Sequence, residues 1–290
     1  MLCYMAGNTP KAKAIGTDLR NARQAAGLTQ RELQAKVGWK THLAIHRAET
    51  GERPLGADQL SELLVALDVP LELGTKLVAM TNDVGDSSWQ AFGSTEQQRQ
   101  LDALIGLEAD AAAITNVSPL LVPGLAQTPE YTRLIMEQAG VPAGEIARRV
   151  AERQGRRHAT ILRRNPAHLS AFIDQSVLYR TLGDAAVLEH QLDLLIDLGK
   201  LDNVEIRVIP FGARWSAALE TPFSVITAAD GSTVVHREDR LAGLFLHEPE
   251  QVHAYETALP KVAEVAMSPA QSAELIAEVM KSPAATEETT

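Results

Sequence analysis

The stretch that decides the fold of the N-terminal region is Leu28–Gly51, LTQRELQAKVGWKTHLAIHRAETG. Thr29 is a good helix-capping residue and Glu32 follows it three positions later, which is the pattern of a capping box at the start of a helix. Gly38 is a stop signal for this helix, and the apolar spacing beyond it predicts a second helix from about Thr41 to Thr50. The stretch therefore predicts two short helices joined by a tight turn.

Helical periodicity continues on both sides of this stretch. Ile15 and Leu19 share one face of a preceding helix that ends at Gly27. Leucines with helical spacing mark a further helix over residues 60–67, and another is expected over Leu71–Met80. Five short helices within the first 80 residues predict a compact all-α bundle. A helix, a turn and a second helix inside such a bundle are the arrangement that places the second helix in the major groove of DNA.

The same residues resemble the signature of the xenobiotic-response-element family of Cro-type repressors. The matching positions are Gly27, Leu28, Thr29, Gln30, Glu32, Leu33, Gly38, Glu49 and Gly51. The interval from Gly38 to Gly51 is one residue longer than the commonest spacing of this motif, so the register of the recognition helix stays open by one position. The resemblance implies a DNA-binding domain with the helix-turn-helix fold.

The resemblance also implies which side chains contact DNA. Gln30 is expected at a phosphate or a base edge, and the other expected contacts are Lys40, Thr41, His42, His46, Arg47 and Arg53. Gln and Arg can make bidentate contacts with bases, while Lys, Thr and His supply phosphate contacts. Glu49 is expected to pair with Arg23, and the structural positions of the motif are Arg23, Thr29, Gly38 and Glu49. The alternative is a bundle used only in protein contacts, with a solvated basic face.

Charge is distributed unevenly along the chain. The 290 residues include 27 basic and 37 acidic side chains, a formal charge of -10 that by itself argues against nucleic-acid binding. Lys11–Arg53 nevertheless holds nine basic and four acidic residues, whereas the 217 residues from Gly74 onward hold 18 basic and 29 acidic ones. One region can therefore approach phosphates, and the larger acidic region suits a protein partner better.

The domain organisation follows from composition and periodicity. We expect a helix-turn-helix domain at 1–80, a linker at 81–95, an α+β domain at 96–282 and a disordered polar tail at 283–290. Helices of the second domain are expected at 96–114, 129–139, 143–164, 185–198, 249–265 and 269–280. Strands are expected at 168–173, 204–209, 223–227 and 233–236, which predicts a small sheet flanked by helices.

Several phrases of the larger region together resemble a family of actinomycete regulators described as WhiJ-like or antitoxin-like. They include Val122–Arg133, Arg153 with Gln154, Val204–Phe211 and Ser268–Ile276. The resemblance covers almost the whole chain and implies a C-terminal domain of unknown function with a small partner protein encoded by a neighbouring gene. Because two weak half-sites must be combined, we also expect a homodimer on a two-fold operator.

Two features of the larger region leave alternatives open. Tyr131 and the loop before it are explained by a capped turn, and the alternative is a surface for a ligand or partner. Trp215 is expected at the rim of a pocket. Arg148–Arg164 contains seven arginines, which we expect to be solvated or paired within the chain, with an acidic partner or DNA as alternatives.

The sequence contains no recognisable catalytic or metal-binding motif. The residues that invite an enzyme interpretation are His236, Glu238, Asp239, His247, Glu248 and His253, but their spacing matches no metal motif. We therefore expect no enzyme, no metal and no cofactor, and Cys3 is expected to be inert. No apolar run of about 18 residues occurs, so we expect no membrane partner and a cytoplasmic location.

The leading hypothesis from the sequence is a transcriptional regulator that binds operator DNA as a dimer. Its larger domain would carry the dimer contact and the site for a small partner protein or ligand. The alternative is an antitoxin-like interaction module that sequesters a small partner and uses DNA binding for autoregulation.

Overall fold

The computed structural model describes residues 9–82, 88–90, 94–238 and 243–281. Contacts divide the chain into two units, Met1–Leu107 with Asp239–Glu248 and Glu108–Glu238 with Pro249–Thr290. Cys3, Asp239 and the tail at 283–290 lie outside the described residues. Among the helices that are described, none is long and apolar enough to cross a membrane.

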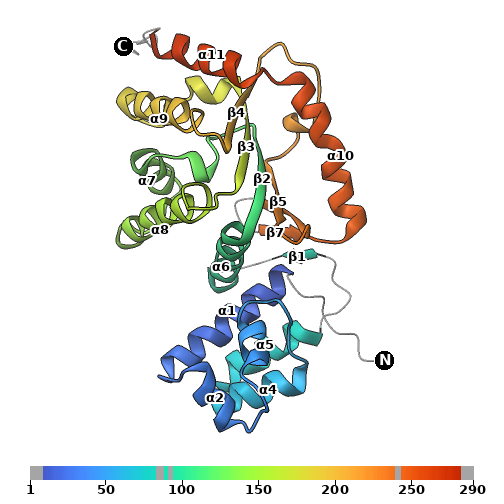
Figure 1. The fold of residues 1–290 in the computed structure, drawn as a ribbon. Coiled ribbons are helices and arrows are strands. Elements are labelled where there is room, and N and C mark those ends of the chain that lie inside the picture. The colour runs from blue at the N-terminus through green and yellow to red at the C-terminus, as the bar shows by residue number, and fades with distance from the viewer. Residues whose placement is uncertain (1–8, 83–87, 91–93, 239–242, 282–290) are drawn as a thin grey trace. The chain divides into compact units, whose positions relative to one another are not determined.

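The first unit contains the helices expected from the sequence (Figure 1), which are α1 (Pro10–Ala25), α2 (Gln30–Lys36), α3 (Leu43–Glu49), α4 (Ala57–Ala66) and α5 (Leu71–Asn82). Their inward-facing apolar side chains form one core, which includes Ile15, Leu19, Leu33, Ile45, Leu60, Leu63 and Leu77. Helix α3 begins at Leu43 instead of Thr41, because Thr41 Oγ1 accepts a hydrogen bond from the Leu43 N–H at 3.2 Å. Such a local side-chain bond competes with the helical conformation.

The capping box at the start of α2 is present as expected. The Glu32 N–H donates to Thr29 Oγ1 at 3.2 Å, and the Thr29 N–H donates to Glu32 Oε2 at 2.7 Å. The hydrogen bond from the Thr29 backbone lowers the pKa of Glu32. After the helix, Gly38 adopts φ = +69°, a conformation that glycine accepts without a steric penalty. Local sequence therefore sets both ends of α2.

The segment expected as a linker contains regular structure. Ser88–Gln90 forms β1, which pairs antiparallel with β7 (Gly243–Leu246) and places Trp89 opposite Phe245. Helix α6 (Ser94–Asp110) follows, and Arg99 Nε lies 2.8 Å from Asp18 Oδ2 of α1. Strand β1 could not be predicted from the sequence, because its partner strand lies far along the chain and turn-forming residues surround it.

The expectation that α6 continues to Ile114 was wrong. Ala111–Ser118 forms strand β2, which pairs parallel with β3 (His168–Asp174) and antiparallel with β5 (Phe223–Ala228). Three successive alanines favour a helix, but helix propensities differ by less than about 1 kcal/mol per residue. Two flanking strands satisfy the backbone of β2 and outweigh that preference.

The second unit is built on a mixed sheet, as the α+β prediction required. Strand β4 (Val204–Ile209) runs parallel to β3, and β6 (Thr233–Glu238) runs antiparallel to β5. The strand order within this unit is β6-β5-β2-β3-β4. Strands β3 to β6 match the four strands expected from the sequence.

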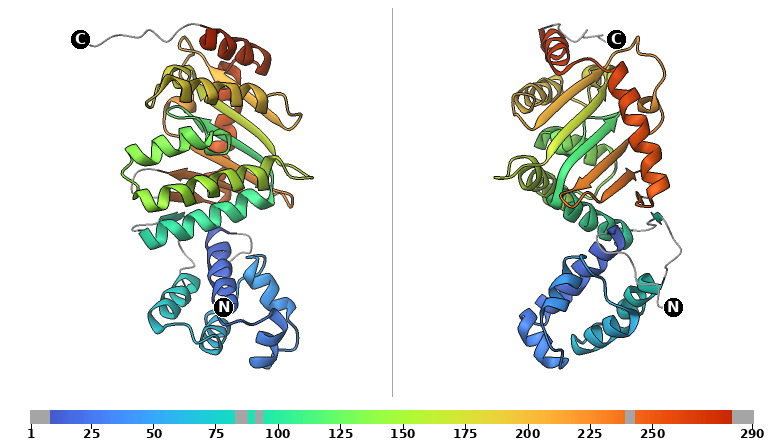
Figure 2. Two further views of the ribbon diagram at one scale, coloured as in Figure 1. Left: turned by 90° about the vertical axis from the view of Figure 1, so that its left-hand side faces the viewer. Right: turned by 45° about the vertical axis from the view of Figure 1, so that its right-hand side comes forward.

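Helices cover both faces of this sheet. They are α7 (Pro129–Gln138), α8 (Ala143–Ile161), α9 (Ala185–Leu198), α10 (Pro249–Val265) and α11 (Pro269–Lys281), with short 3₁₀ turns η1 (Gly124–Ala126), η2 (Gln175–Tyr179) and η3 (Ala217–Leu219). The parallel strands β2, β3 and β4 follow one another across the sheet in chain order. Because such connections are right-handed, the helices that join these strands lie on one face of the sheet. Figure 2 shows α7, α8 and α9 on that face and α10 on the other.

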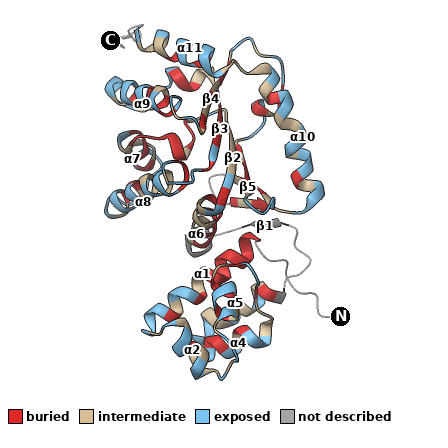
Figure 3. Cartoon of the chain, viewed as in Figure 1, coloured by how far each residue is buried: buried red, intermediate tan, exposed pale blue. Residues whose placement is uncertain are grey.

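The face of the sheet covered by α8 is called the α8 face, and the opposite one the α10 face. On the α10 face, the rings of Phe223 and Tyr255 lie 5.0 Å apart and Arg207 Nη2 donates to the Ala263 carbonyl at 2.9 Å. On the α8 face, Ile114 lies opposite Ile226 of the neighbouring strand. Figure 3 shows that buried residues are concentrated in the strands, while the outer sides of the helices are exposed.

Candidate nucleic-acid interface

Helix α3 presents one side to the core and the other to solvent. Ile45 and Ala48 are buried, whereas His46 and Arg47 are exposed. Leu43 is 43% exposed and lies on the same side of the helix as His46 and Arg47, which follow it by three and four residues. The structure therefore gives α3 an outward row of one apolar and two nitrogen-bearing side chains.

Glu49 ties this helix to the rest of the bundle. Arg23 Nε and Nη2 of α1 donate to Glu49 Oε1 and Oε2 at 2.6 and 2.9 Å. The hydrogen bonds to Glu49 raise the pKa of Arg23. The pair expected between these residues is thus present, and Glu49 serves the fold because its carboxylate is turned inward.

Gln30 belongs to the same network. Its Nε2 donates to Glu49 Oε2 at 2.8 Å, and its side chain is partly buried. Gln30 was expected at a phosphate or base edge, and the structure instead gives its amide nitrogen a partner inside the domain. A side-chain NH₂ carries two N–H groups and the carbonyl oxygen accepts independently, so a contact with DNA is compatible with this bond.

Helices α1 and α3 approach each other closely at Gly16. An added Cβ at this position would lie 2.7 Å from the Glu49 carbonyl oxygen and would also collide with the Ala48 carbonyl oxygen. Only glycine allows this approach without displacement of one helix. Gly16 and the Arg23–Glu49 pair together determine how α3 is presented.

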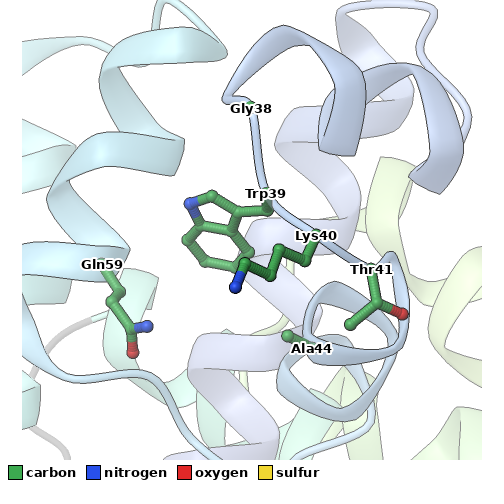
Figure 4. A pocket seen from close by; sticks show the side chains of 6 residues that line it. All are labelled: Gly38, Trp39, Lys40, Thr41, Ala44 and Gln59. Carbon is green, nitrogen blue, oxygen red and sulfur yellow. The ribbon is translucent and has the colours of Figure 1, made fainter.

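The turn before α3 forms a shallow hollow of about 330 Å³ (Figure 4). It is lined by Gly38, Trp39, Lys40, Thr41, Ala44 and Gln59. Trp39 Nε1 donates to Glu62 Oε2 of α4 at 3.0 Å, and the Trp39 carbonyl accepts from Gln34 Nε2. The indole therefore fixes the turn against α4, and the exposed Lys40 side chain lines the hollow beside it.

The remaining expected contacts lie on the surface of the first unit. Lys40, Thr41 and Arg53 are exposed, while His42 is partly buried at the N-cap of α3 and makes no capping hydrogen bond. The structure brings Lys40, Thr41, His46 and Arg47 together within the turn and α3. Arg53 follows α3, and its N–H donates to the Arg47 carbonyl at 3.1 Å.

Two candidate residues were missed by the sequence analysis. Leu43 is an exposed leucine on α3, and its position in the helical phase of His46 and Arg47 could have revealed it. Gln59 lies on α4 and joins the turn only through tertiary packing. No local pattern marks Gln59.

The two candidates of the second unit have different environments. Tyr131 is only 1% exposed, its hydroxyl oxygen accepts from the Val122 N–H at 3.4 Å, and burial raises its pKa. Its side chain is therefore packed inside the second unit. Trp215, by contrast, is 71% exposed.

The histidine-containing segments form no metal site among the described residues, in which no three His, Cys, Asp or Glu side chains come together suitably. His247 Nε2 lies 4.0 Å from Glu248 Oε1. His236 is buried on β6, and burial together with Arg156 lowers its pKa to about 3. It is therefore a neutral imidazole at neutral pH.

Two family models match the chain. One, described as a helix-turn-helix, matches residues 19–73, and the other, described as a domain of unknown function (DUF5753), matches residues 101–278. No curated protein and no solved structure matches the chain. The helix-turn-helix match agrees with the geometry of α2 and α3 and supports a DNA-binding regulator. Because the second match spans more than half of the 290 residues, the chain belongs to the DUF5753 family and combines that domain with a helix-turn-helix.

Proposed function

We propose that the protein is a sequence-specific transcriptional regulator that inserts α3 into the major groove of operator DNA in the cytoplasm. The observation that carries this proposal is the outward row Leu43, His46 and Arg47 on a helix whose inner side is fixed by the Arg23–Glu49 pair. Rigid presentation of such a row on a helix suits base recognition.

Each exposed side chain has a chemical role in this proposal. Arg47 suits a bidentate contact with guanine, and Leu43 suits the methyl group of thymine. Lys40, Thr41 and Arg53 flank the row and suit phosphates. Base contacts would set the sequence preference, while phosphate contacts would set the salt dependence.

The test is to select DNA duplexes from a random pool and to measure their binding by fluorescence anisotropy over a range of salt concentrations. Arg47→Ala should weaken binding by about 1–3 kcal/mol and relax the preference at one base pair. Lys40→Ala should weaken binding to selected and scrambled duplexes equally and reduce the salt slope by about 1. Lys200→Ala, in an exposed pair with Asp197 of the second unit, is the control. Unchanged binding by both test variants would refute the proposal.

The proposed DNA-bound form is a homodimer that contacts its second copy through the second unit. Support comes from exposed apolar side chains that follow β3 and β4: Tyr179, Phe211, Trp215 and Leu219. The rings of Tyr179 and Phe211 lie 6.0 Å apart and stack. Exposed aromatic clusters are typical of contact surfaces. Loss of dimer mass in light scattering of Phe211→Ser and Trp215→Ala would support this contact.

The alternative, an antitoxin-like module that sequesters a small neighbour-encoded protein, uses the same surface. It is favoured over a dimer contact if the wild type is monomeric and binds the co-expressed neighbour. Arg47→Ala should then retain the neighbour, and Trp215→Ala should lose it. A wild-type protein that is dimeric and does not bind the neighbour-encoded protein would contradict this alternative.

A further inference from the structure

A row of polar side chains crosses the α8 face of the sheet. His236 of β6 lies opposite Ser224 of β5, which lies opposite Asn116 of β2. Asn116 Nδ2 donates to Ser224 Oγ at 2.6 Å, while Asn116 Oδ1 is buried with no hydrogen-bond partner among the described residues. Buried amide oxygens are rarely left without a donor. The neighbouring row, Ile114 and Ile226, is apolar, so the polar row is a local feature.

Helix α8 contains three partly buried arginines, Arg153, Arg156 and Arg157. Arg156 forms a bidentate ion pair with Glu108, at 2.8 and 2.7 Å, and the two side chains are 11% and 7% exposed. Burial alone would lower the pKa of Arg156, but Glu108 raises it. Arg156 is also close enough to His236 to lower the pKa of that imidazole. Arg156 therefore connects α8 to the polar row and has its charge neutralised.

Arg153 and Arg157 differ from Arg156 in their hydrogen-bond partners. Arg153 Nη1 donates to Gln127 Oε1 at 2.6 Å, and Arg157 Nη1 donates to the Gln127 carbonyl at 3.1 Å. Neither arginine forms an ion pair within the described part of the chain. Burial and the neighbouring Arg156 lower the pKa of Arg153 to about 10, and burial also lowers the pKa of Arg157.

The nearby carboxylates do not compensate Arg153 directly. Glu108 is engaged by Arg156, and Glu152 accepts from Arg148 Nη1 at 2.9 Å. Glu238 acts on Arg153 only as a longer-range charge and is exposed to solvent. Arg153 is partly buried, and within the described residues its guanidinium is bonded only to a neutral amide. This arrangement is unfavourable, and an oxyanion is the partner that its fork of N–H donors fits.

We propose that Arg153 and Arg157 bind the oxyanion of a small hydroxyl-bearing metabolite, whose hydroxyl groups reach the row formed by His236, Ser224 and Asn116. The guanidinium groups recognise a phosphate or carboxylate. Asn116 Oδ1 accepts a hydrogen bond from a ligand hydroxyl. The site itself is independent of the proposed DNA binding, whereas a role for the ligand as an effector rests on that function.

Thermal unfolding of the full chain tests the site, with ribose 5-phosphate and inorganic phosphate as probes and sodium chloride at matched ionic strength as the reference. Ribose 5-phosphate about tenfold above its Kd should raise the Tm of the second unit by about 3–6 °C in a saturable manner. Inorganic phosphate alone should act more weakly, because it lacks the sugar hydroxyls. Polyvalent anions also stabilise proteins non-specifically, so the comparison between variants decides the outcome.

Arg153→Gln should abolish the saturable rise, and Arg164→Gln, which removes an exposed arginine after the same helix, should retain it. If Arg153→Gln does not fold by circular dichroism, Arg157→Gln replaces it with the same expectation. Identical probe responses in the wild type and the folded variant overturn the site, as does the absence of any saturable response to either probe in the wild type. Arg47→Ala should respond like the wild type, which separates failure of the ligand site from failure of DNA binding.

Discussion

Both carboxylate oxygens of Glu49 accept hydrogen bonds from Arg23, at 2.6 and 2.9 Å, and so join α1 to the end of α3. Gln30 of α2 donates to the same carboxylate at 2.8 Å. One buried acid therefore links three helices, and the direction of the exposed side of α3 depends on it. An acidic residue close to a DNA-binding surface is explained by this role in the fold.

Loss of the Glu49 carboxylate should destabilise the first unit. Glu49→Ala leaves Arg23 buried without its counter-charge, and we expect the free energy of unfolding to fall by about 3–5 kcal/mol. Chemical denaturation followed by circular dichroism measures this loss, and Glu52→Ala, at an exposed position, should change it by less than about 0.5 kcal/mol. The double variant Arg23→Met/Glu49→Leu should recover part of the loss. A purely additive double variant would show that the pair is not the cause.

Two glycine substitutions in the first unit should have opposite effects. Gly16→Ala introduces a Cβ 2.7 Å from the Glu49 carbonyl oxygen and should destabilise the unit by about 1–3 kcal/mol. Gly74→Ala lies within α5, where the nearest atom to the added Cβ is Leu64 Cδ1 at 4.0 Å. It should stabilise the unit by up to about 1 kcal/mol through helix propensity. Equal shifts in denaturation midpoint would contradict the close contact of α1 with α3.

His236 should make the second unit sensitive to mild acid. Its folded pKa is about 3. The unfolded value is about 6.5, so the unfolded state binds one more proton between these values and stability falls as the pH decreases. From about pH 7.5 to about pH 5, the wild type should lose about 2 kcal/mol more than His236→Gln. Urea denaturation at both pH values measures the difference, and parallel pH profiles would reject it.

Gln191 holds the turn before α7 in place. Its Nε2 donates to the Ala126 carbonyl at 2.7 Å, and its Oε1 accepts from the Thr128 N–H at 2.8 Å, in a fully buried position. Gln191→Leu should lower the free energy of unfolding by about 1–3 kcal/mol for each backbone group left without a hydrogen-bond partner. Hydrogen exchange at the Thr128 amide should accelerate, whereas His190→Ala, on the exposed side of α9, should leave it unchanged.

Elements with local signals were predictable from the sequence. Capping residues and glycines delimit α2, and α9 and α10 begin and end where the periodicity indicated. The start of strand β2, Ala111–Ile114, was mistaken for the end of a helix because its alanines have helical preference, while its strand conformation comes from β3 and β5. Helix α8 ends at Ile161, three residues before Arg164, and beyond its end Arg163 Nη2 donates to the Ala111 carbonyl at 2.7 Å.

The exposure of several candidate DNA-contact residues was predictable from the sequence, but their packing was not. The exposed positions of Lys40, His46 and Arg47 agree with the resemblance. The engagement of Gln30 by Glu49 and the contribution of Gln59 depend on how α2 and α4 pack. The sequence also did not predict that the arginines of α8 have different partners. A run of arginines does not indicate which of them contacts a carboxylate.

The sequence by itself determined the helix-turn-helix, because capping boxes, stop glycines and apolar spacing act over a few residues and need no distant partner. It also determined the separation of a basic segment from an acidic remainder. Only the tertiary structure decided that β2 is a central strand and that Tyr131 is buried. It alone showed that Arg156 is neutralised by Glu108 while Arg153 is not. These features depend on contacts between residues far apart in the chain, which the packing of the whole unit selects.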